Sequence, residues 1–575
     1  MHVDRLYHAD GYLHLIETLR NWEISLFAGV TGGGIIHFTK HLSPYHDNSF
    51  EEAEHLNRFF NVGEYVAGFA PLGYYLASGK FAAAAATTGA ATKLLGCGLT
   101  DAKLHNIPAV YIVPISAKPA VGFAPLQDSS IFGLNILQQL EAECAESIFV
   151  LTGDMHDAEK LQKAYAVLMR HQPVVLVLDP EGLSRTFHHN PVMTVPLEVQ
   201  RMEPVYRPWP LHKLRDRKVV ILVGSGMPAT VEGRRLTTEL AQALRAPVLY
   251  SINGANSVER DNPFLYGYIG FGGNDAAQSV WKSIDENTLL IALGADFDEY
   301  TTGVKPVLCD EAWILGDDCS RYGMVDGSWR HWIHGTCLEI FGPLESLVAN
   351  LVDAIRSDPP AVISMLPAPN SLNGRPLASA RAGFVDLGRF YDTIDRLWRS
   401  NSIGFDDVCM AYKDRQYVTQ RPNMHCPFFS LYRGSAMGSA LGLGIGARLG
   451  APEKTVFVFT GDGCFRLVAG TLAEARSLGI NLFVLNNGIY GIVRNGLSKI
   501  LPNEPVERYH DNLDMLNYAA IAAGYGWDYL SVDADLRNLP GIIERCYQTG
   551  KPSLLIELRV DPEQDLGPNP RVENL

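Results

Sequence analysis

Residues 454–463 read Lys454-Thr455-Val456-Phe457-Val458-Phe459-Thr460-Gly461-Asp462-Gly463, an apolar run that leads directly into a Gly-Asp-Gly turn. The next apolar run, residues 481–485, ends at Asn486-Asn487, so that 22 residues separate Gly463 from Asn486. Continuous apolar runs of this length predict strands that are buried on both faces, as in a parallel sheet. The helical pattern between them, over residues 472–478, predicts the crossover that parallel strands require. This stretch therefore predicts a doubly wound α/β fold.

The same alternation of short apolar runs and helical patterns extends over the whole chain. Further strands are predicted at the following ranges: 25–30, 82–87, 109–114, 173–179, 219–226 (ending in a glycine turn) and 288–294. Proline-rich stretches at residues 188–210 and 359–370 predict two linkers. We therefore expect three consecutive doubly wound parallel-sheet domains, at residues 1–187, 211–357 and 375–575.

Composition excludes several classes of partner. The chain has 575 residues, 47% of them hydrophobic, and a formal net charge of -15 that is spread along it. This charge argues against nucleic-acid and membrane-surface binding. The nine cysteines form no Cys-x-x-Cys pair, and residues 1–5 do not begin a signal peptide. No apolar run reaches the roughly 18 residues that span a bilayer. We expect a cytoplasmic protein that acts on small molecules.

Asp462 and Asn487 follow the carboxyl ends of two predicted parallel strands. Ligands of open α/β sheets bind at that edge. Carboxylate, amide and carbonyl oxygens suit Mg²⁺, which also takes oxygens from a bound diphosphate. Gly461 and Gly463 allow close approach of the backbone to phosphate. The alternative interpretation is an ordinary turn at a strand end that caps a helix.

Gly461-Asp462-Gly463, followed by Asn486-Asn487-Gly488-Ile489-Tyr490-Gly491, resembles the cofactor motif of the thiamine-diphosphate (ThDP) enzymes of the acetolactate synthase and pyruvate decarboxylase superfamily. The resemblance implies that Asp462, the Asn487 side chain and the Ile489 carbonyl hold Mg²⁺. It also implies that Gly461, Gly463 and Cys464 contact the cofactor. The three domains would then be the pyrimidine-binding, central and diphosphate-binding domains.

Two segments upstream resemble the rest of the family's cofactor site. Residues 59–64 and 77–80 resemble its glutamate stretch, which implies that Glu64 hydrogen-bonds N1′ of the aminopyrimidine and promotes loss of the C2 proton. Residues 434–438 resemble its Gly-x-Met-Gly segment, which implies a Ser435 carbonyl on the 4′-amino group and Met437 as the wedge that bends ThDP. Gln127 resembles the active-site glutamine of acetolactate synthase and lyase members. The alternatives are a helix-start glutamate, a core methionine and a solvated loop residue.

Departures from the family patterns narrow the reaction. Residues 115–122 lack the histidine pair of pyruvate decarboxylases, and Val493 stands where those enzymes carry a glutamate. These absences favour a carboligase or C–C lyase that acts on a 2-oxo acid or 2-hydroxyketone through a ThDP enamine. A non-oxidative 2-oxo-acid decarboxylase and a catalytically inactive ThDP-fold binding protein stay as alternatives.

Two further departures concern cofactor and acceptor. In residues 294–300 an acid and a tyrosine replace both arginines of the flavin-contacting stretch of acetolactate synthases, so FAD is doubtful. Residues 495–497 lack the tryptophan expected there, which argues against the acceptor pocket of branched-chain amino-acid synthesis. The resemblance also implies a homodimer or homotetramer with the active site at the subunit interface.

Overall fold

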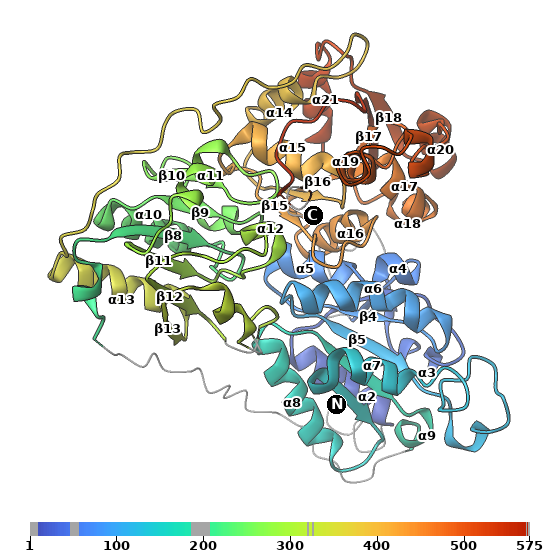
Figure 1. Cartoon of the computed structure of the whole chain (residues 1–575). Coiled ribbons are helices and arrows are strands. Elements are labelled where there is room, and N and C mark those ends of the chain that lie inside the picture. Colours follow the sequence, from blue (N-terminus) through green and yellow to red (C-terminus); the bar gives the residue numbers. More distant parts are fainter. Residues whose placement is uncertain are drawn as a thin grey trace.

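A computed structural model describes residues 10–45, 57–185, 208–318, 321–324, 327–570 and 572. In these ranges the strands form three sheets, and every strand pair is parallel. Helices cover both faces of the sheets (Figure 1). The predicted class, three consecutive doubly wound domains, is confirmed. The first linker lies outside the described residues apart from 208–210, as do residues 1–9, while the exact domain boundaries stay a prediction.

The N-terminal sheet has the strand order β2-β3-β1-β4-β5-β7-β6 in the described residues. Its strands are β1 (Leu26–Gly29), β2 (Ser43–Pro44), β3 (Arg58–Asn61), β4 (Ala83–Ala85), β5 (Val110–Pro114), β6 (Ile148–Leu151) and β7 (Val174–Leu178). Its helices are α2 (Gly11–Asn21), α3 (Ile36–Thr39), α4 (Glu64–Ala67), α5 (Ala70–Ser78), α6 (Ala90–Leu104), α7 (Ile136–Cys144), α8 (Asp157–Met169) and α9 (Pro180–Leu183). The central strands β5 and β7 are buried along their whole length, which explains their unbroken apolar sequence.

The central sheet has the order β10-β9-β8-β11-β12-β13. Its strands are β8 (Lys218–Val223), β9 (Val248–Tyr250), β10 (Leu265–Tyr268), β11 (Thr288–Leu293), β12 (Glu311–Gly316) and β13 (Thr336–Phe341). Its helices are α10 (Val231–Leu244), α11 (Asp275–Lys282), α12 (Glu299–Thr302) and α13 (Leu344–Ser357). Two apolar cores, one on each face, enclose this sheet.

The C-terminal sheet has the order β15-β14-β16-β17-β19-β18. Its strands are β14 (Ser402–Asp406), β15 (Phe428–Ser430), β16 (Thr455–Gly461), β17 (Asn481–Asn486), β18 (Asp528–Ser531) and β19 (Leu554–Arg559). Its helices are α14 (Leu387–Asp395), α15 (Met410–Thr419), α16 (Ser439–Gly450), α17 (Asp462–Val468), α18 (Leu472–Ala475), α19 (Gly491–Ile500), α20 (Tyr518–Tyr525) and α21 (Leu539–Cys546). The motif strands β16 and β17 pair directly, so their carboxyl ends lie together.

The N-terminal and C-terminal domains share one apolar core. Helix α5 packs on α16 between the two sheets (Figure 1). The helices approach closely because glycines lie at the contact: a Cβ on Gly73 would lie 1.9 Å from the Leu443 carbonyl oxygen, and one on Gly446 would lie 1.8 Å from that of Ala70. This packing joins the N-terminal domain to the C-terminal domain, whose sheet carries the Gly-Asp-Gly motif.

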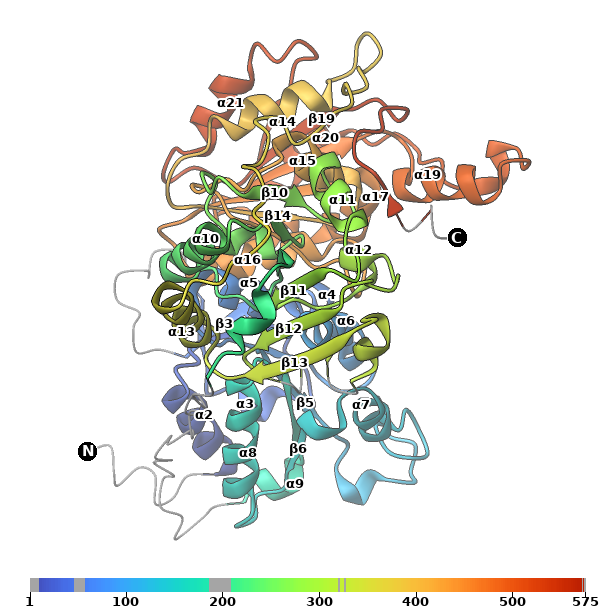
Figure 2. The ribbon, with the colours of Figure 1, turned by 60° about the vertical axis from the view of Figure 1, so that its left-hand side comes forward.

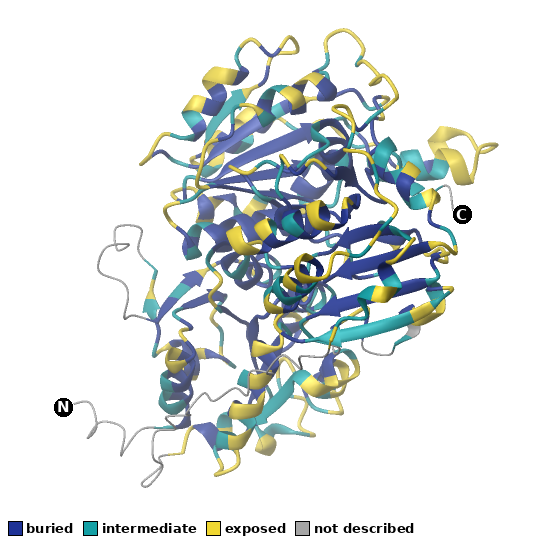
Figure 3. Cartoon of the chain, turned by 90° about the vertical axis from the view of Figure 1, so that its left-hand side faces the viewer, coloured by how far each residue is buried: buried dark blue, intermediate teal, exposed yellow. Residues whose placement is uncertain are grey.

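The central domain contacts the C-terminal domain through a small aromatic cluster. Tyr300 stacks on Phe271 and on Tyr432, with ring centroids 4.5 and 5.1 Å apart. Seen from the side of the central domain, the three sheets are largely buried, and exposed residues gather on outer helices and loops (Figure 3). The central domain therefore contacts the C-terminal domain at Tyr432, in the segment that leads into α16.

Candidate active site

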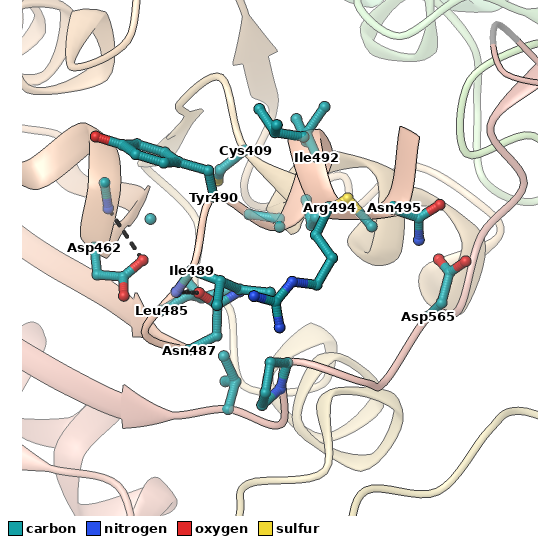
Figure 4. Close-up of a pocket in the computed structure, with 18 of the residues that line it drawn as sticks. Cys409, Asp462, Leu485, Asn487, Ile489, Tyr490, Ile492, Arg494, Asn495 and Asp565 are labelled. Atoms are coloured by element: carbon teal, nitrogen blue, oxygen red, sulfur yellow. Dashed lines mark hydrogen bonds between the residues drawn. The ribbon is translucent and has the colours of Figure 1, made fainter. Parts of the chain in front are cut away.

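A cavity of about 490 Å³ opens at the carboxyl ends of the C-terminal strands (Figure 4). Gly461 at the end of β16 and Leu485 near the end of β17 line it. The predicted site residues that line it are Ser435, Met437, Gly461, Asp462, Gly463, Cys464, Asn487 and Ile489. The structure thus brings the predicted diphosphate, metal and wedge residues together. Glu64 and Gln127 are not among the lining residues.

Asp462 lies at the junction of strand and helix. The sequence predicts a Gly-Asp-Gly turn, but β16 runs to Gly461 and α17 begins at Asp462 itself. The buried carboxylate accepts hydrogen bonds from the backbone N–H groups of Gly463 (3.0 Å) and Gly488 (2.7 Å). Burial raises the pKa of Asp462, and these two hydrogen bonds oppose the rise. The N–H donors fix the carboxylate across the two strand ends.

The two asparagines have different roles. Asn486 is buried and donates to the Glu557 side chain at 2.7 Å, which ties β17 to β19. Asn487 lines the cavity, and its amide oxygen accepts from the Ile489 N–H at 3.0 Å (Figure 4). Asp462, Asn487 and Ile489 therefore present a carboxylate, an amide and a backbone segment at one end of the cavity. This donor set fits Mg²⁺ together with a diphosphate.

Residues 408–411 are a part of the cavity that the sequence analysis missed. They lead from β14 into α15, which begins at Met410 with Cys409 as its N-cap. Neither α15 nor α17 has a side-chain hydrogen bond at its N-cap. Apart from the Gly463 N–H, which donates to the Asp462 carboxylate, first-turn N–H groups of the two helices can therefore bind an anion. The apolar run at 403–405 before Asp406-Asp407 is the signal that would have indicated a strand end here.

Gly463 is required by the close approach of Tyr490. A Cβ at Gly463 would lie 2.5 Å from the Tyr490 Cε1 atom. Any larger residue would push this ring, which also lines the cavity, out of place. The glycine after Asp462 therefore keeps the α17 amides and the Tyr490 ring close together.

Glu64 and Gln127 lie on the side of the N-terminal sheet where its strands have their carboxyl ends. Glu64 is half-buried and begins α4, three residues after β3 ends. Gln127 lies on an exposed loop with a left-handed backbone (φ 58°), and its side-chain oxygen accepts from the Thr88 hydroxyl at 3.2 Å, just beyond β4. Glu64 therefore lies beyond the carboxyl end of β3 and Gln127 near that of β4, and neither lines the cavity of the same chain.

The far end of the cavity is formed by α19 and the segment after β19. The Arg494 side chain extends from α19 toward the turn at Asn487 (Figure 4), where it forms a two-pronged ion pair with the buried Asp511 at 2.6 and 2.8 Å. Val493 is 43% exposed. Helix α19 has no buried residue in the described part of the chain, and it projects from the molecule (Figure 2).

The stretch that corresponds to the flavin-contacting pattern is engaged within the chain. The carboxylate of Asp296 contacts the guanidinium groups of Arg433 (2.6 Å) and Arg321 (3.6 Å), and Tyr300 is stacked between aromatic rings. An acid and a stacked ring at the two arginine positions offer no cation to a flavin. These residues do not fit FAD, and no step below involves one.

Three family models match the chain in order. Residues 10–130 match "Thiamine pyrophosphate enzyme, N-terminal TPP binding domain", residues 214–314 match the central domain of the same enzymes, and residues 412–557 match the C-terminal TPP binding domain. The chain belongs to the ThDP enzymes of the acetolactate synthase and pyruvate decarboxylase superfamily. Thiamine pyrophosphate and ThDP are the same cofactor.

Curated relatives of this ThDP enzyme are acetolactate synthases. It is 25% identical to the acetolactate synthase of Mycobacterium avium over 513 residues, which covers 84% of this chain and 76% of the relative. It is 22% identical to the acetolactate synthase isozyme 1 large subunit of Escherichia coli over 97% of this chain and 95% of the relative. These similarities support a ThDP-dependent transferase or lyase.

Two further observations concern disulfide bonds and membrane-spanning helices. In the described ranges eight cysteines are free, and none forms a disulfide. Among the same residues, no helix has both the length and the hydrophobicity needed to cross a membrane.

Proposed function

We propose that this ThDP enzyme is a Mg²⁺-dependent carboligase or C–C lyase, similar to acetolactate synthase, that acts on a 2-oxo acid or 2-hydroxyketone. The observation that carries the proposal is the cavity itself. Its one end gathers the oxygen groups of Asp462, Asn487 and Ile489, and its other end has Val493 in place of an acid. The acetolactate synthase relatives support the same class of reaction.

The residues at the first end would bind the cofactor. Asp462 and Asn487, with the Ile489 carbonyl, would hold Mg²⁺, and amide N–H groups at the starts of α15 and α17 would donate hydrogen bonds to the diphosphate. When bound, ThDP supplies a carbon nucleophile for attack on a carbonyl group. Met437 and Ser435 also line the cavity, and the Met437 carbonyl accepts a hydrogen bond from Tyr65 of the N-terminal domain. There they would set the cofactor's bend and hold its amino group.

The other end of the cavity favours ligation over release of an aldehyde. Val493 cannot donate a proton, and Arg494 is held by Asp511. Asp565 also lines the cavity; burial raises its pKa, but Lys413 outweighs burial and holds the pKa below its usual value, so the carboxylate is ionised at neutral pH. A bound acceptor carbonyl then has the advantage of proximity over proton transfer.

The active site would be completed by a second copy of the chain. Glu64 and Gln127 lie outside the cavity of their own chain. The loop around Gln127 exposes Phe123 (84%), Leu126 (93%) and Phe132 (73%), which is a large apolar area for a protein surface. A homodimer, or a homotetramer built from it, would cover this loop and bring Glu64 to the partner's cavity, where its carboxylate would receive or return a proton at N1′ of the pyrimidine. The free cysteines support a reducing, cytoplasmic location.

The test is the product formed by the purified protein with ThDP and Mg²⁺ from a panel of 2-oxo acids with aldehyde acceptors. Acyloin or acetohydroxy-acid products support the proposal. Rapid release of aldehyde that no acceptor diverts establishes the decarboxylase alternative. ThDP binding without turnover of any substrate establishes the inactive binding protein.

The role of Glu64 has its own test. We expect Glu64→Gln to fold and to bind ThDP, but to slow proton–deuterium exchange at C2 of the cofactor by about 10²–10⁴-fold, the range typical of lost acid–base catalysis. Glu141, which is exposed on α7 of the same domain, offers a Glu141→Gln control for the loss of one charge. Exchange at the wild-type rate in Glu64→Gln would remove this residue from the mechanism.

A further inference from the structure

Residues 432–438, called here the wedge segment, carry Ser435 and Met437 to the cavity without the support of a helix or strand. They connect β15 to α16. Ser435 has a left-handed backbone (φ 52°), which a residue with a side chain seldom adopts, and Gly438 is also left-handed (φ 87°). A segment with such a backbone keeps its shape only if the surrounding structure holds it.

Side chains of two domains form hydrogen bonds with the backbone of the wedge segment. The Arg433 N–H donates to the His105 Nε2 atom at 3.0 Å, and the Gly434 N–H donates to the Asp101 carboxylate at 2.9 Å. The Gly438 N–H donates to the Asp407 carboxylate at 2.9 Å. The Met437 carbonyl accepts a hydrogen bond from the Tyr65 hydroxyl. Tyr65, Asp101 and His105 all belong to the N-terminal domain, whereas Asp407 follows β14.

The Arg433 side chain adds the central domain to this arrangement. Its guanidinium group donates to Asp296 at 2.6 Å, to Asp298 at 2.8 Å and to the carbonyl of Leu104, the last residue of α6, at 2.6 Å. The side chain is 7% exposed. Asp298 also accepts from the Tyr432 hydroxyl at 2.7 Å. One buried arginine thus joins all three domains at the wedge segment.

Arg321 belongs to the same ion cluster, but its ion pairs are with Asp296 and Asp317 and it lies outside the wedge segment. Its guanidinium lies 3.6 Å from Asp296 and 3.0 Å from Asp317, and it is as buried as Arg433, with 7% of the side chain exposed. The two arginines therefore share a carboxylate, a depth of burial and a charge. They differ in that only Arg433 is part of the segment that carries Ser435 and Met437.

We propose that Arg433 is a positioning residue, which fixes the wedge segment to Asp296 and Asp298 of the central domain so that Ser435 and Met437 stand at the correct place against the bound cofactor. This inference rests on the proposed ThDP function. It assigns the central domain a direct part in setting the active-site geometry. The planar guanidinium serves three acceptors at once, which a lysine ammonium on a flexible chain cannot reproduce.

The experiment compares Arg433→Lys with Arg321→Lys. Both variants keep the charge of the buried cluster and lose one guanidinium fork. In Arg433→Lys we expect ThDP affinity, measured by calorimetry with Mg²⁺, to stay close to that of the wild type, because the diphosphate end is untouched. We expect C2 proton exchange per bound cofactor to slow by about 10–100-fold, since small displacements of positioning groups have effects of this size. Arg321→Lys is expected to lose similar thermal stability with C2 exchange at the wild-type rate.

A second readout does not require cofactor. In the cofactor-free protein, hydrogen–deuterium exchange of peptides that cover residues 432–438 should be about fivefold or more faster in Arg433→Lys than in the wild type, and unchanged in Arg321→Lys. If Arg433→Lys fails to fold, Asp298→Asn replaces it, because the asparagine still caps α12 but binds the guanidinium more weakly. Its expected effects have the same direction.

The outcomes separate this inference from the function on which it rests. Equal amide exchange and equal C2 exchange in the Arg433 and Arg321 variants would overturn the positioning role, because the ion cluster would then be only a structural link. Failure of the wild-type protein to bind ThDP would overturn the proposed function. Faster amide exchange at 432–438 in the Arg433 variant alone would still show that Arg433 holds the segment.

Discussion

The Asp101 carboxylate is buried between the domains while it holds the Gly434 N–H. Its second oxygen has no hydrogen-bond partner among the described residues. His105 Nε2 lies 3.8 Å from the first oxygen, the one that accepts from Gly434. Burial raises the pKa of Asp101 to about 7, with the nearby Asp407 charge acting in the same direction and the Gly434 N–H opposing it. The folded protein therefore holds a proton here that the unfolded chain releases near pH 4.

This difference predicts how stability depends on pH. Between about pH 4 and pH 7 the folded state binds more protons than the unfolded state, so the contribution of Asp101 to stability falls as pH rises and is constant above pH 7. Asp101→Asn keeps an acceptor for Gly434 and removes the titration. We expect the wild type to lose a few kcal/mol more than this variant between pH 5 and 8, at about 1.4 kcal/mol for each unit of pKa difference. Thermal unfolding midpoints of both proteins at pH 5 and pH 8 measure this difference. Equal changes of the midpoint in the wild type and in Asp101→Asn would contradict the prediction.

Asp462 leads to a prediction about the metal. Without its carboxylate, the diphosphate charge would lack a correctly held Mg²⁺. We expect Asp462→Ala to weaken ThDP binding by at least about 100-fold, the upper end of what the loss of an outer-shell partner costs a metal site. Calorimetry with and without Mg²⁺ measures it. Asp514→Ala, which removes an exposed carboxylate outside the cavity, is the matched control. Wild-type affinity in Asp462→Ala would exclude it as a ligand.

At the scale of elements, the buried strands could be predicted and the polar helix α15 could not. Strands such as β16 and β17 are buried on both faces, so their sequences are unbroken apolar runs. Helix α15 reads Met-Ala-Tyr-Lys-Asp-Arg-Gln-Tyr-Val-Thr, which by pattern is a surface helix, yet Lys413, Asp414 and Gln416 are at most 1% exposed. Lys413 is neutralised by Asp414 and by the distant Asp565. A partner 152 residues away leaves no local pattern.

The difference between local sequence patterns and long-range contacts also explains which parts of the site could be predicted. Asp462, Asn487 and Met437 lie in short motifs with fixed spacing, and the structure gathers them at one cavity. The start of α15 at the cavity and the ion pairs of Arg433 depend on tertiary contacts, and no spacing in the sequence reports them. The position of Glu64 outside the cavity of its own chain likewise depends on how two domains pack.

Helix α19 carries Val493, the residue on which the proposed preference for ligation depends. Val493 lines the cavity, and its partial exposure leaves room for a longer side chain. A glutamate there would offer a positioned proton donor. We expect Val493→Glu to increase the aldehyde share of the product by at least about tenfold, below the 10²–10⁴ range of a fully effective general acid. Val493→Gln, of equal size but without the acid, should keep the wild-type ratio. Chromatography of the products measures the ratio of aldehyde to ligation product. An unchanged ratio in Val493→Glu would show that position 493 does not deliver a proton.

At the scale of the whole molecule, the apolar N-terminal loop around Gln127 and the projecting α19 are two surfaces that the single chain leaves uncovered. On the loop, Leu126 and Phe132 are largely exposed, and at the far end of α19 Ile500 and Leu501 are 45% and 43% exposed. The projecting end of α19 is visible beyond the body of the molecule (Figures 2 and 3). A symmetric dimer that covers these surfaces would bury each of them twice, once on each subunit.

This arrangement predicts that two inactive chains can restore activity together. If Glu64 serves the cavity of the partner subunit, a heterodimer of Glu64→Gln and Asp462→Ala chains contains one site with both defects and one site with none. Random mixing of equal amounts should then recover about one quarter of wild-type activity, because half of the dimers are mixed and each has one intact site. If each site is built within one chain, every site keeps one defect and no activity returns. Differently tagged chains, purified as verified heterodimers, distinguish the two cases. Recovery requires denaturation and joint refolding if the subunits do not exchange, and wild-type chains taken through the same procedure set the reference.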